Sequence, residues 1–282
     1  MKALITTLLM AMAALAAQAQ ATADSTIRKR LTHLTDSVIA EARTLYLYEY
    51  AAWHSADALT EAGIDPAKVG ASGVAIDDKG ILRYLYVDKQ GDLLFEYMLD
   101  IQTRFALHSA KKRRLDTTEK EAIMMRSQAI DAIVKYYRDS ITIAPEAKGR
   151  LNYDIIRLPD GTIRAYIIQG TTKSGYQPIG NDYVVDFDSR MRPLRFVRQH
   201  HSYMETPLLG ISIHSHTPEN LTITATDIAN YMLYGYDQRR LGVMLVTITT
   251  YPELYVVAFY GKTFTAEIMN FDELKKKYDN LK

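Results

Sequence analysis

The 282-residue sequence contains no cysteine. This absence excludes a disulfide framework, lipid attachment at a cysteine and a cysteine nucleophile. The charge is also balanced, with 34 Lys and Arg residues against 33 Asp and Glu residues, so no excess of one sign favours a nucleic-acid or anionic-membrane partner. Without covalent cross-links the fold has to be stabilised by an apolar core, and 48% of the residues are hydrophobic.

Several common catalytic motifs are also missing from the chain. We find no glycine-rich phosphate loop, no Gly-x-Ser-x-Gly elbow and no His-Glu-x-x-His pair. Beyond the N-terminus, no segment is apolar for long enough to cross a bilayer. The sequence therefore points away from the familiar nucleotide, serine-hydrolase and zincin chemistries.

The N-terminus reads as a secretory signal peptide. Lys2 is followed by an apolar run from Ala3 to Ala17, and Ala17-Gln18-Ala19 matches an Ala-x-Ala cleavage site. The run is short and alanine-rich for a transmembrane helix, which is the alternative interpretation. We expect residues 1–19 to be removed, leaving an exported periplasmic or secreted protein without a transmembrane segment.

The remaining pattern predicts an α+β protein. Apolar residues at helical spacing predict a helix over 24–59, and alternating residues with intervening turns predict three short strands over 73–100. An N-cap signal opens a further helix over 116–137, after which the chain reads mainly as strands. We therefore divide the mature chain into a helical and small-sheet region, 20–115, and a mixed-sheet domain flanked by helices, 116–282.

The stretch ISIHSHTPENLTITATD carries the chemistry that stands out most. On a strand, His214 and His216 share one face while Ser215 takes the other. Two imidazoles placed this way can bind zinc, and Asp227, eleven residues later at the start of a predicted helix, can supply a third ligand. The alternative is structural, because Thr224-x-x-Asp227 also fits a helix capping arrangement.

These residues resemble the zinc metalloprotease signature of the JAMM/MPN family, His-x-His followed after seven residues by Ser-x-x-Asp. Here the corresponding residues are His214, His216, Thr224 and Asp227. The family also has an upstream glutamate in Glu-x-x-Gly, which Glu146 matches 68 positions before the first histidine. The resemblance covers roughly residues 116–261 and implies a mixed sheet flanked by helices, of the cytidine-deaminase-like kind.

The resemblance also implies roles for these residues. Zinc would be held by His214, His216 and Asp227, with water in the fourth position. Glu146 would act as general base and then as acid, and the Thr224 hydroxyl would stabilise the oxyanion. The implied activity is zinc-dependent hydrolysis of a peptide or isopeptide bond in a peptide or protein substrate.

Two features depart from the family pattern. The proline that normally follows the second histidine is displaced, giving Thr217-Pro218. Residues 181–203 read as a strand hairpin where the family usually has a helix. Because of these departures, a non-catalytic envelope protein that binds a partner on a degenerate JAMM-like scaffold is the alternative function. If the match is coincidental, the chain is instead a binding module.

Other candidates for the site are weaker. His200 and His201 are adjacent, so on a strand they face opposite ways, and we interpret them as surface residues. Glu205 is a rival base, but its place beside Pro207 suggests a loop.

Overall fold

The computed structural model describes residues 2–110, 112–149, 151–216, 222–250 and 253–279. The chain divides into two compact units. Unit 1 comprises residues 1–40, 211–223 and 243–282, and unit 2 comprises residues 41–210 and 224–242. The segment with the paired histidines therefore belongs to unit 1, whereas the helix with the aspartate belongs to unit 2.

The longest helix, α1 (Lys2–Glu61), contributes residues to both units. Its buried apolar residues include Leu31 in unit 1 and Leu45, Ala51 and Leu59 in unit 2. The helix predicted over 24–59 is thus confirmed. Across the described ranges, no helix combines the length and apolar character that a membrane span requires.

The first sheet of unit 2 is an antiparallel meander. Its strands are β1 (Ala71–Ile76), β2 (Ile81–Val87), β3 (Leu93–Asp100) and β4 (Ala106–Ser109). The three predicted strands are present, and β4 is one that the sequence did not predict. Buried side chains of α1, such as Ala51 and Leu59, pack with Leu82 and Phe95 of this sheet in one hydrophobic core.

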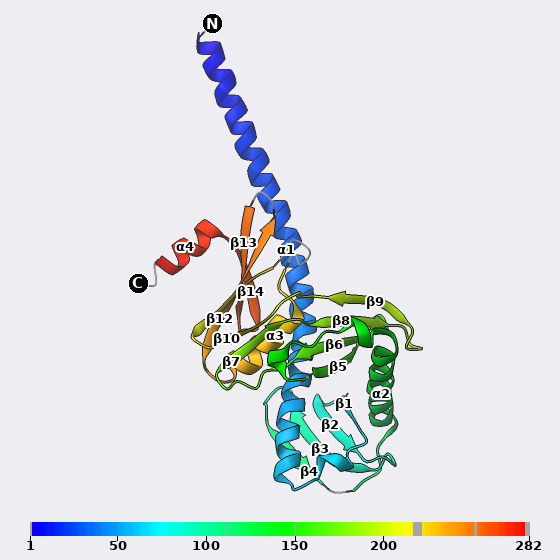
Figure 1. Ribbon diagram of the computed structural model, residues 1–282. Helices are drawn as coiled ribbons and strands as arrows, with labels where there is room; N and C mark the ends of the chain where they lie inside the picture. The colour runs from blue at the N-terminus through cyan, green and yellow to red at the C-terminus, as the bar shows by residue number, and fades with distance from the viewer. Residues whose placement is uncertain (1, 111, 150, 217–221, 251–252, 280–282) are drawn as a thin grey trace. The chain divides into compact units, whose positions relative to one another are not determined.

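The second helix connects this sheet to the next one. A capping box between Asp116 and Glu119 starts α2 (Thr117–Tyr137), as the sequence predicted. Helix α2 lies beside both sheets (Figure 1). Its Ile123 packs in the core of the first sheet, and its Ile133 packs in the core of the second. The predicted domain boundary between residues 115 and 116 therefore lies inside unit 2, because one helix covers both sheets.

The second sheet has the strand order β5-β6-β8-β9. Its strands are β5 (Leu151–Arg157), β6 (Ile163–Gln169), β8 (Tyr183–Phe187) and β9 (Pro193–Arg198). β8 and β9 pair antiparallel, which confirms the hairpin predicted within 181–203. The two central strands, β6 and β8, are almost completely buried, and residues of α2 pack with them in one hydrophobic core.

The remaining elements of unit 2 are short. A separate ladder joins β7 (Tyr176–Gly180) to β10 (Tyr203–Pro207). The helix α3 (Ala225–Asn230) continues as a wider π-helical segment, η4 (Tyr231–Tyr236). The single-turn helices are η1 (Pro66–Lys68), η2 (Arg138–Ser140) and η3 (Pro145–Ala147).

Unit 1 is built around a sheet with the order β11-β12-β13-β14. Its elements are β11 (Gly210–His216), β12 (Leu241–Thr250), β13 (Glu253–Tyr260), β14 (Thr265–Asn270) and α4 (Phe271–Asp279). Val256 and Ala258 of β13 pack with Met269 of β14 in its core.

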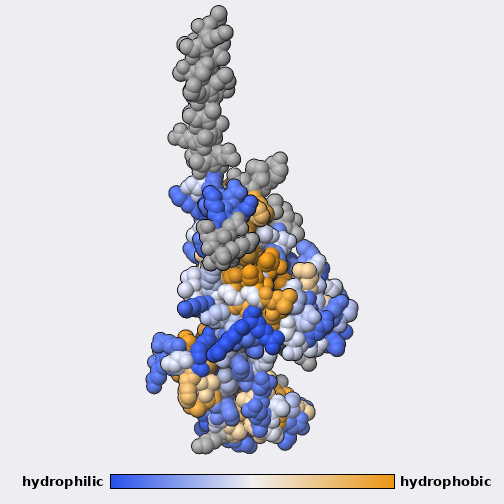
Figure 2. Space-filling model, turned by 90° about the vertical axis from the view of Figure 1, so that its left-hand side faces the viewer, coloured by the Kyte–Doolittle hydropathy of each residue, from blue (hydrophilic) through white to orange (hydrophobic). Residues whose placement is uncertain are grey.

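Helices and sheets that occupy separate stretches of the chain make this an α+β fold, as predicted. Every strand pair whose register is described is antiparallel, so the parallel pairing of a mixed sheet is not among them. Hydrophobic side chains also reach the surface and gather in patches on the face drawn in Figure 2.

Candidate metal site

Strand β11 has an unusual arrangement of side chains. Its inward positions hold His214 and His216, which are only 7% and 6% exposed. Its outward positions hold Ile211 and Ile213, which are 43% and 60% exposed. An amphipathic strand normally turns its apolar residues inward. Here the imidazoles are buried and the isoleucines are exposed, which indicates that the histidines have a role beyond packing.

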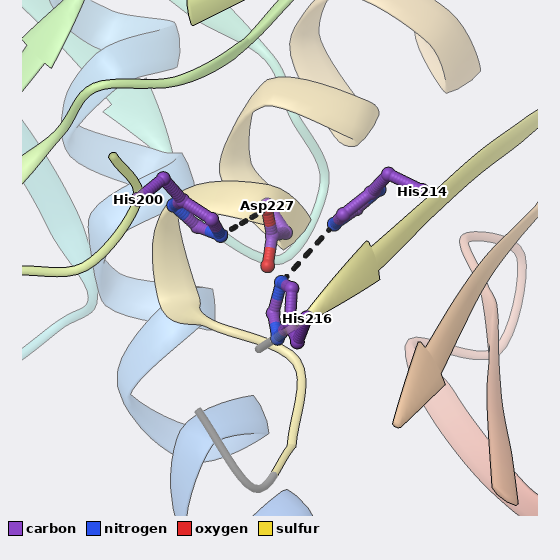
Figure 3. A group of neighbouring side chains, drawn as sticks. All are labelled: His200, His214, His216 and Asp227. Atoms are coloured by element: carbon purple, nitrogen blue, oxygen red, sulfur yellow. Dashed lines mark hydrogen bonds and ion pairs between the residues drawn. The ribbon is translucent and has the colours of Figure 1, made fainter. Parts of the chain in front are cut away.

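The two imidazoles face each other through the same ring atom. Their Nε2 atoms lie 3.2 Å apart, and a dashed line marks this contact in Figure 3. His216 Nδ1 donates a hydrogen bond to the carbonyl oxygen of Thr222 at 2.6 Å. Because a carbonyl only accepts, a proton lies on Nδ1, which leaves Nε2 as the ring atom of His216 that faces His214.

In unit 2, Asp227 lies in the first turn of α3 and is 3% exposed. Its Oδ2 accepts hydrogen bonds from the Thr224 backbone N–H at 2.8 Å and from the Thr224 hydroxyl at 2.7 Å. The capping arrangement that the sequence offered as an alternative therefore exists. It occupies Oδ2, and the other oxygen, Oδ1, lies 3.5 Å from His200 Nε2.

His200, which follows β9, is held by a second carboxylate. Its Nδ1 donates to Asp182 Oδ1 at 2.5 Å, and Asp182 also accepts a hydrogen bond from the Thr226 hydroxyl. Burial opposes the charged imidazolium, but the carboxylates of Asp227 and Asp182 outweigh it and raise the pKa of His200 to about 9. The interpretation of His200 as a surface residue was wrong, since its side chain is only 11% exposed.

The buried group of His200, His214, His216 and Asp227 could bind a metal ion, with each residue offering one ligand atom (Figure 3). Imidazole nitrogen and carboxylate oxygen suit zinc and also other divalent transition metals. The group therefore supports a metal site without selecting the metal. Thr217-Pro218, where the sequence departs from the family pattern, lies outside the described residues.

The other predicted residues lie in different surroundings. Glu146 is exposed on the turn η3. Its negative charge adds to that of Glu205, which is the larger cause, in raising the pKa of Lys173. Thr224 is buried, and its hydroxyl is engaged in the cap of α3. Glu205 lies in strand β10, not in the loop that the sequence suggested, and forms an ion pair with Lys173 at 2.5 Å. The predicted catalytic roles of Glu146 and Thr224 remain predictions.

Sequence reasoning missed two members of this arrangement, His200 and Asp182. Both lie near the ends of the β8–β9 hairpin, and the backbone N–H of Gln199 bonds to the Asp182 carbonyl at 2.9 Å. The pairing of the hairpin predicted at 181–203 places its first and last residues side by side. That closeness was the only signal in the sequence that could have identified the pair.

No family model, no curated protein and no solved structure matches the chain.

Proposed function

We propose that this chain binds one zinc ion through His214, His216 and Asp227. The observation that supports this most directly is the 3.2 Å separation of the two histidine Nε2 atoms. Two nitrogens that each lie 2.0–2.1 Å from a tetrahedral zinc are about 3.4 Å apart. The hydrogen bond from His216 Nδ1 to a backbone carbonyl adds support, because metal-binding histidines are usually oriented in this way.

His200 occupies the position that decides between an open and a closed site. Asp182 accepts the Nδ1 proton, so Nε2 can act as the ligand once the imidazolium loses its Nε2 proton, as in the carboxylate–histidine–metal arrangements of known sites. If His200 does not ligate, the fourth position is open to water and the site is of the catalytic type.

For an open site, the proposed activity is hydrolysis of a peptide or isopeptide bond outside the cytoplasm. Bound zinc would lower the pKa of its water to about 7 and polarise the scissile carbonyl. Within the chain, Glu146 is the proposed base that takes the proton of that water, and Thr224 the proposed donor to the oxyanion. The JAMM/MPN-like spacing of these residues supports this assignment.

The second candidate function is non-catalytic binding of a partner on a scaffold stabilised by metal. A specific observation favours it: Asp182 orients the His200 ring as a metal-binding histidine is oriented, and with His200 as a ligand all four positions of a zinc site would be filled by protein.

Metal content tests the zinc site itself. We expect about one zinc per chain for the wild type by elemental analysis, and a large loss for His214→Ala and His216→Ala, because each removes a protein ligand. The matched control is His201→Ala, an exposed histidine outside the group, which should retain its zinc. A wild type purified in the presence of zinc that still contains none would exclude the proposal.

Turnover separates the two functions. A library of peptides and isopeptides is screened first with the wild type. Glu146→Gln should then lower turnover by about two orders of magnitude at unchanged zinc content, while Glu121→Gln, an exposed glutamate on α2, should match the wild type. If His200→Gln loses the metal and no substrate is cleaved, the closed, non-catalytic site is correct.

A further inference from the structure

A cavity of about 280 Å³ lies within unit 2, and none of the candidate metal ligands lines it. Segments far apart in the sequence meet here: the end of α1, the loop between β6 and β7, the end of β10, and η4 with the turn after it. Its lining includes Trp53, Tyr176, Leu208, Tyr234, Lys173 and Arg240. We call it the Trp53 pocket.

One wall of the Trp53 pocket is apolar. Trp53, the single tryptophan of the chain, lies with its ring centroid 5.3 Å from that of Tyr234 and the two planes inclined by 50°. Leu208 adds aliphatic surface to this wall. The tryptophan is 40% exposed, although such a large ring gains free energy when it is buried. The wall is therefore suited to a planar or branched apolar group.

Another part of the lining is the loop between β6 and β7, which the carboxylate of Glu205 holds in place. Glu205 accepts a hydrogen bond from the Thr171 hydroxyl at 2.5 Å and pairs with the Lys173 ammonium at 2.5 Å. The backbone N–H of Leu208 donates to the Gly175 carbonyl at 3.1 Å. These contacts fix the loop, and Glu205 balances the charge of Lys173.

The guanidinium of Arg240 supplies a second cation without such a partner. Across the described part of the chain, no carboxylate forms an ion pair with it. Gly175 has a φ of +81°, and a Cβ added there would lie 2.8 Å from Arg240 Nη1. The glycine therefore allows the guanidinium to lie close to the loop. The pocket combines one uncompensated positive charge with an aromatic wall.

We propose that the Trp53 pocket binds a small carboxylate that carries an apolar side chain. A guanidinium recognises a carboxylate by two parallel hydrogen bonds, and the Trp53–Tyr234 wall contacts the side chain. The cavity is slightly smaller than the roughly 300–1,000 Å³ typical of drug-sized ligands, so it takes a group the size of one residue. The C-terminal residue of a peptide and a free organic acid both have this chemistry.

Fluorescence of the single tryptophan reports on binding directly. The full chain is titrated with N-acetylphenylalanine and with its amide, and calorimetry repeats each titration. We expect saturable binding of the acid and at least about tenfold weaker binding of the amide, because the amide lacks the charge that strengthens the hydrogen bonds. Arg240→Gln should weaken binding of the acid by a similar factor, whereas the neighbouring Arg239→Gln should not.

The peptide Ala-Ala-Phe with a free C-terminus distinguishes the two sources. Tighter binding of the peptide identifies a peptide terminus as the ligand, and binding of the free acid alone identifies an organic acid. Equal affinity for acid and amide, an equal loss in both arginine variants, or no saturable binding of the acid or the peptide would overturn the proposal. Zinc plays no part in this test, so its outcome is independent of the proposed hydrolase activity.

Discussion

At the scale of single residues, unit 2 contains a buried pair of carboxyl groups. Glu49 of α1 and Asp154 of β5 are both buried, and Asn152 donates to Glu49 Oε2 at 2.9 Å. Glu49 Oε1 and Asp154 Oδ2 have no donor among the described groups, so a hydrogen bond between them requires one carboxyl to keep its proton. Burial raises the pKa of both carboxyls, and the negative charge of Asp154 raises that of Glu49 further.

This pair predicts a stability that declines as the pH rises. In the unfolded chain the carboxyls titrate near pH 4, whereas the native state keeps a proton to higher pH. Above pH 4 the native state therefore binds more protons than the unfolded chain does. The free energy of unfolding falls as the pH rises from 4 to the raised pKa of the native pair. Glu49→Gln should be more stable than the wild type at pH 7 by about 1 kcal/mol or more, with no gain near pH 4.

Urea unfolding at both pH values measures this effect. Glu121→Gln, an exposed glutamate, is the control and should change stability little at either pH. A Glu49→Gln variant that is less stable than the wild type at neutral pH would show that the pair is ionised and compensated in the native state.

Asp182 should act on the metal through His200. Its carboxylate orients the imidazole and accepts the Nδ1 proton, which makes Nε2 the better ligand. Asp182→Asn preserves the side-chain size, and we expect about 10- to 100-fold weaker zinc binding in a competition titration if His200 is a ligand. Asp131→Asn, on the exposed side of α2, is the matched control. Unchanged affinity in Asp182→Asn would argue for the open site.

At the scale of elements, the short helix α3 depends on its N-cap. The Thr224 hydroxyl accepts a hydrogen bond from the Asp227 N–H at 3.1 Å, and Asp227 bonds back to the Thr224 N–H. The same aspartate that is proposed to bind zinc therefore starts the helix, so the cap fixes the carboxylate at the helix terminus.

Substitution of Thr224 separates capping from catalysis. Thr224→Ala should lower the free energy of unfolding by about 1 kcal/mol because the cap is lost, whereas Thr224→Ser keeps the hydroxyl and should match the wild type. Chemical denaturation measures both variants. If Thr224→Ala is as stable as the wild type, the hydroxyl does not contribute to the cap. Turnover lost in Thr224→Ala and retained in Thr224→Ser would support the proposed oxyanion role.

At the scale of the whole molecule, zinc binding should raise the Tm of the protein. A ligand that binds only the native state stabilises it by about 2.7 kcal/mol at a free concentration 100 times Kd. Chelation should therefore lower the Tm of the wild type and leave that of His216→Ala unchanged. Differential scanning calorimetry with and without chelator checks this, and an equal shift in both proteins would indicate that chelation acts elsewhere.

Signal-peptide removal is also expected to retain the contacts that α1 makes from Asp24 onward. Asp24 pairs with Arg28 at 2.8 Å and accepts a hydrogen bond from Tyr255. These residues follow the predicted cleavage site, so they are retained in a chain that begins near Gln20. N-terminal sequencing of the exported protein checks the position. An intact Met1 in the envelope fraction would favour an anchor.

The sequence by itself determined the local features of this protein. Helical periodicity predicted α1, the Asp116 cap predicted the start of α2, and strand alternation placed His214 and His216 on one face of β11. These features depend on neighbours within a few residues, so the chain pattern is sufficient to predict them. The absence of cysteine likewise excluded a disulfide framework, lipid attachment at a cysteine and a cysteine nucleophile.

The tertiary structure decided what depends on distant segments. It buried the histidine face of β11 rather than its isoleucine face, and it paired His200 with Asp182, 18 positions earlier. It also packed α2 against two sheets of unit 2. The local sequence pattern before such a helix is the same as the pattern expected at a domain boundary. Burial and pairing of this kind depend on which helices and strands pack together. The apolar pattern of one segment does not say which other segment will pack against it.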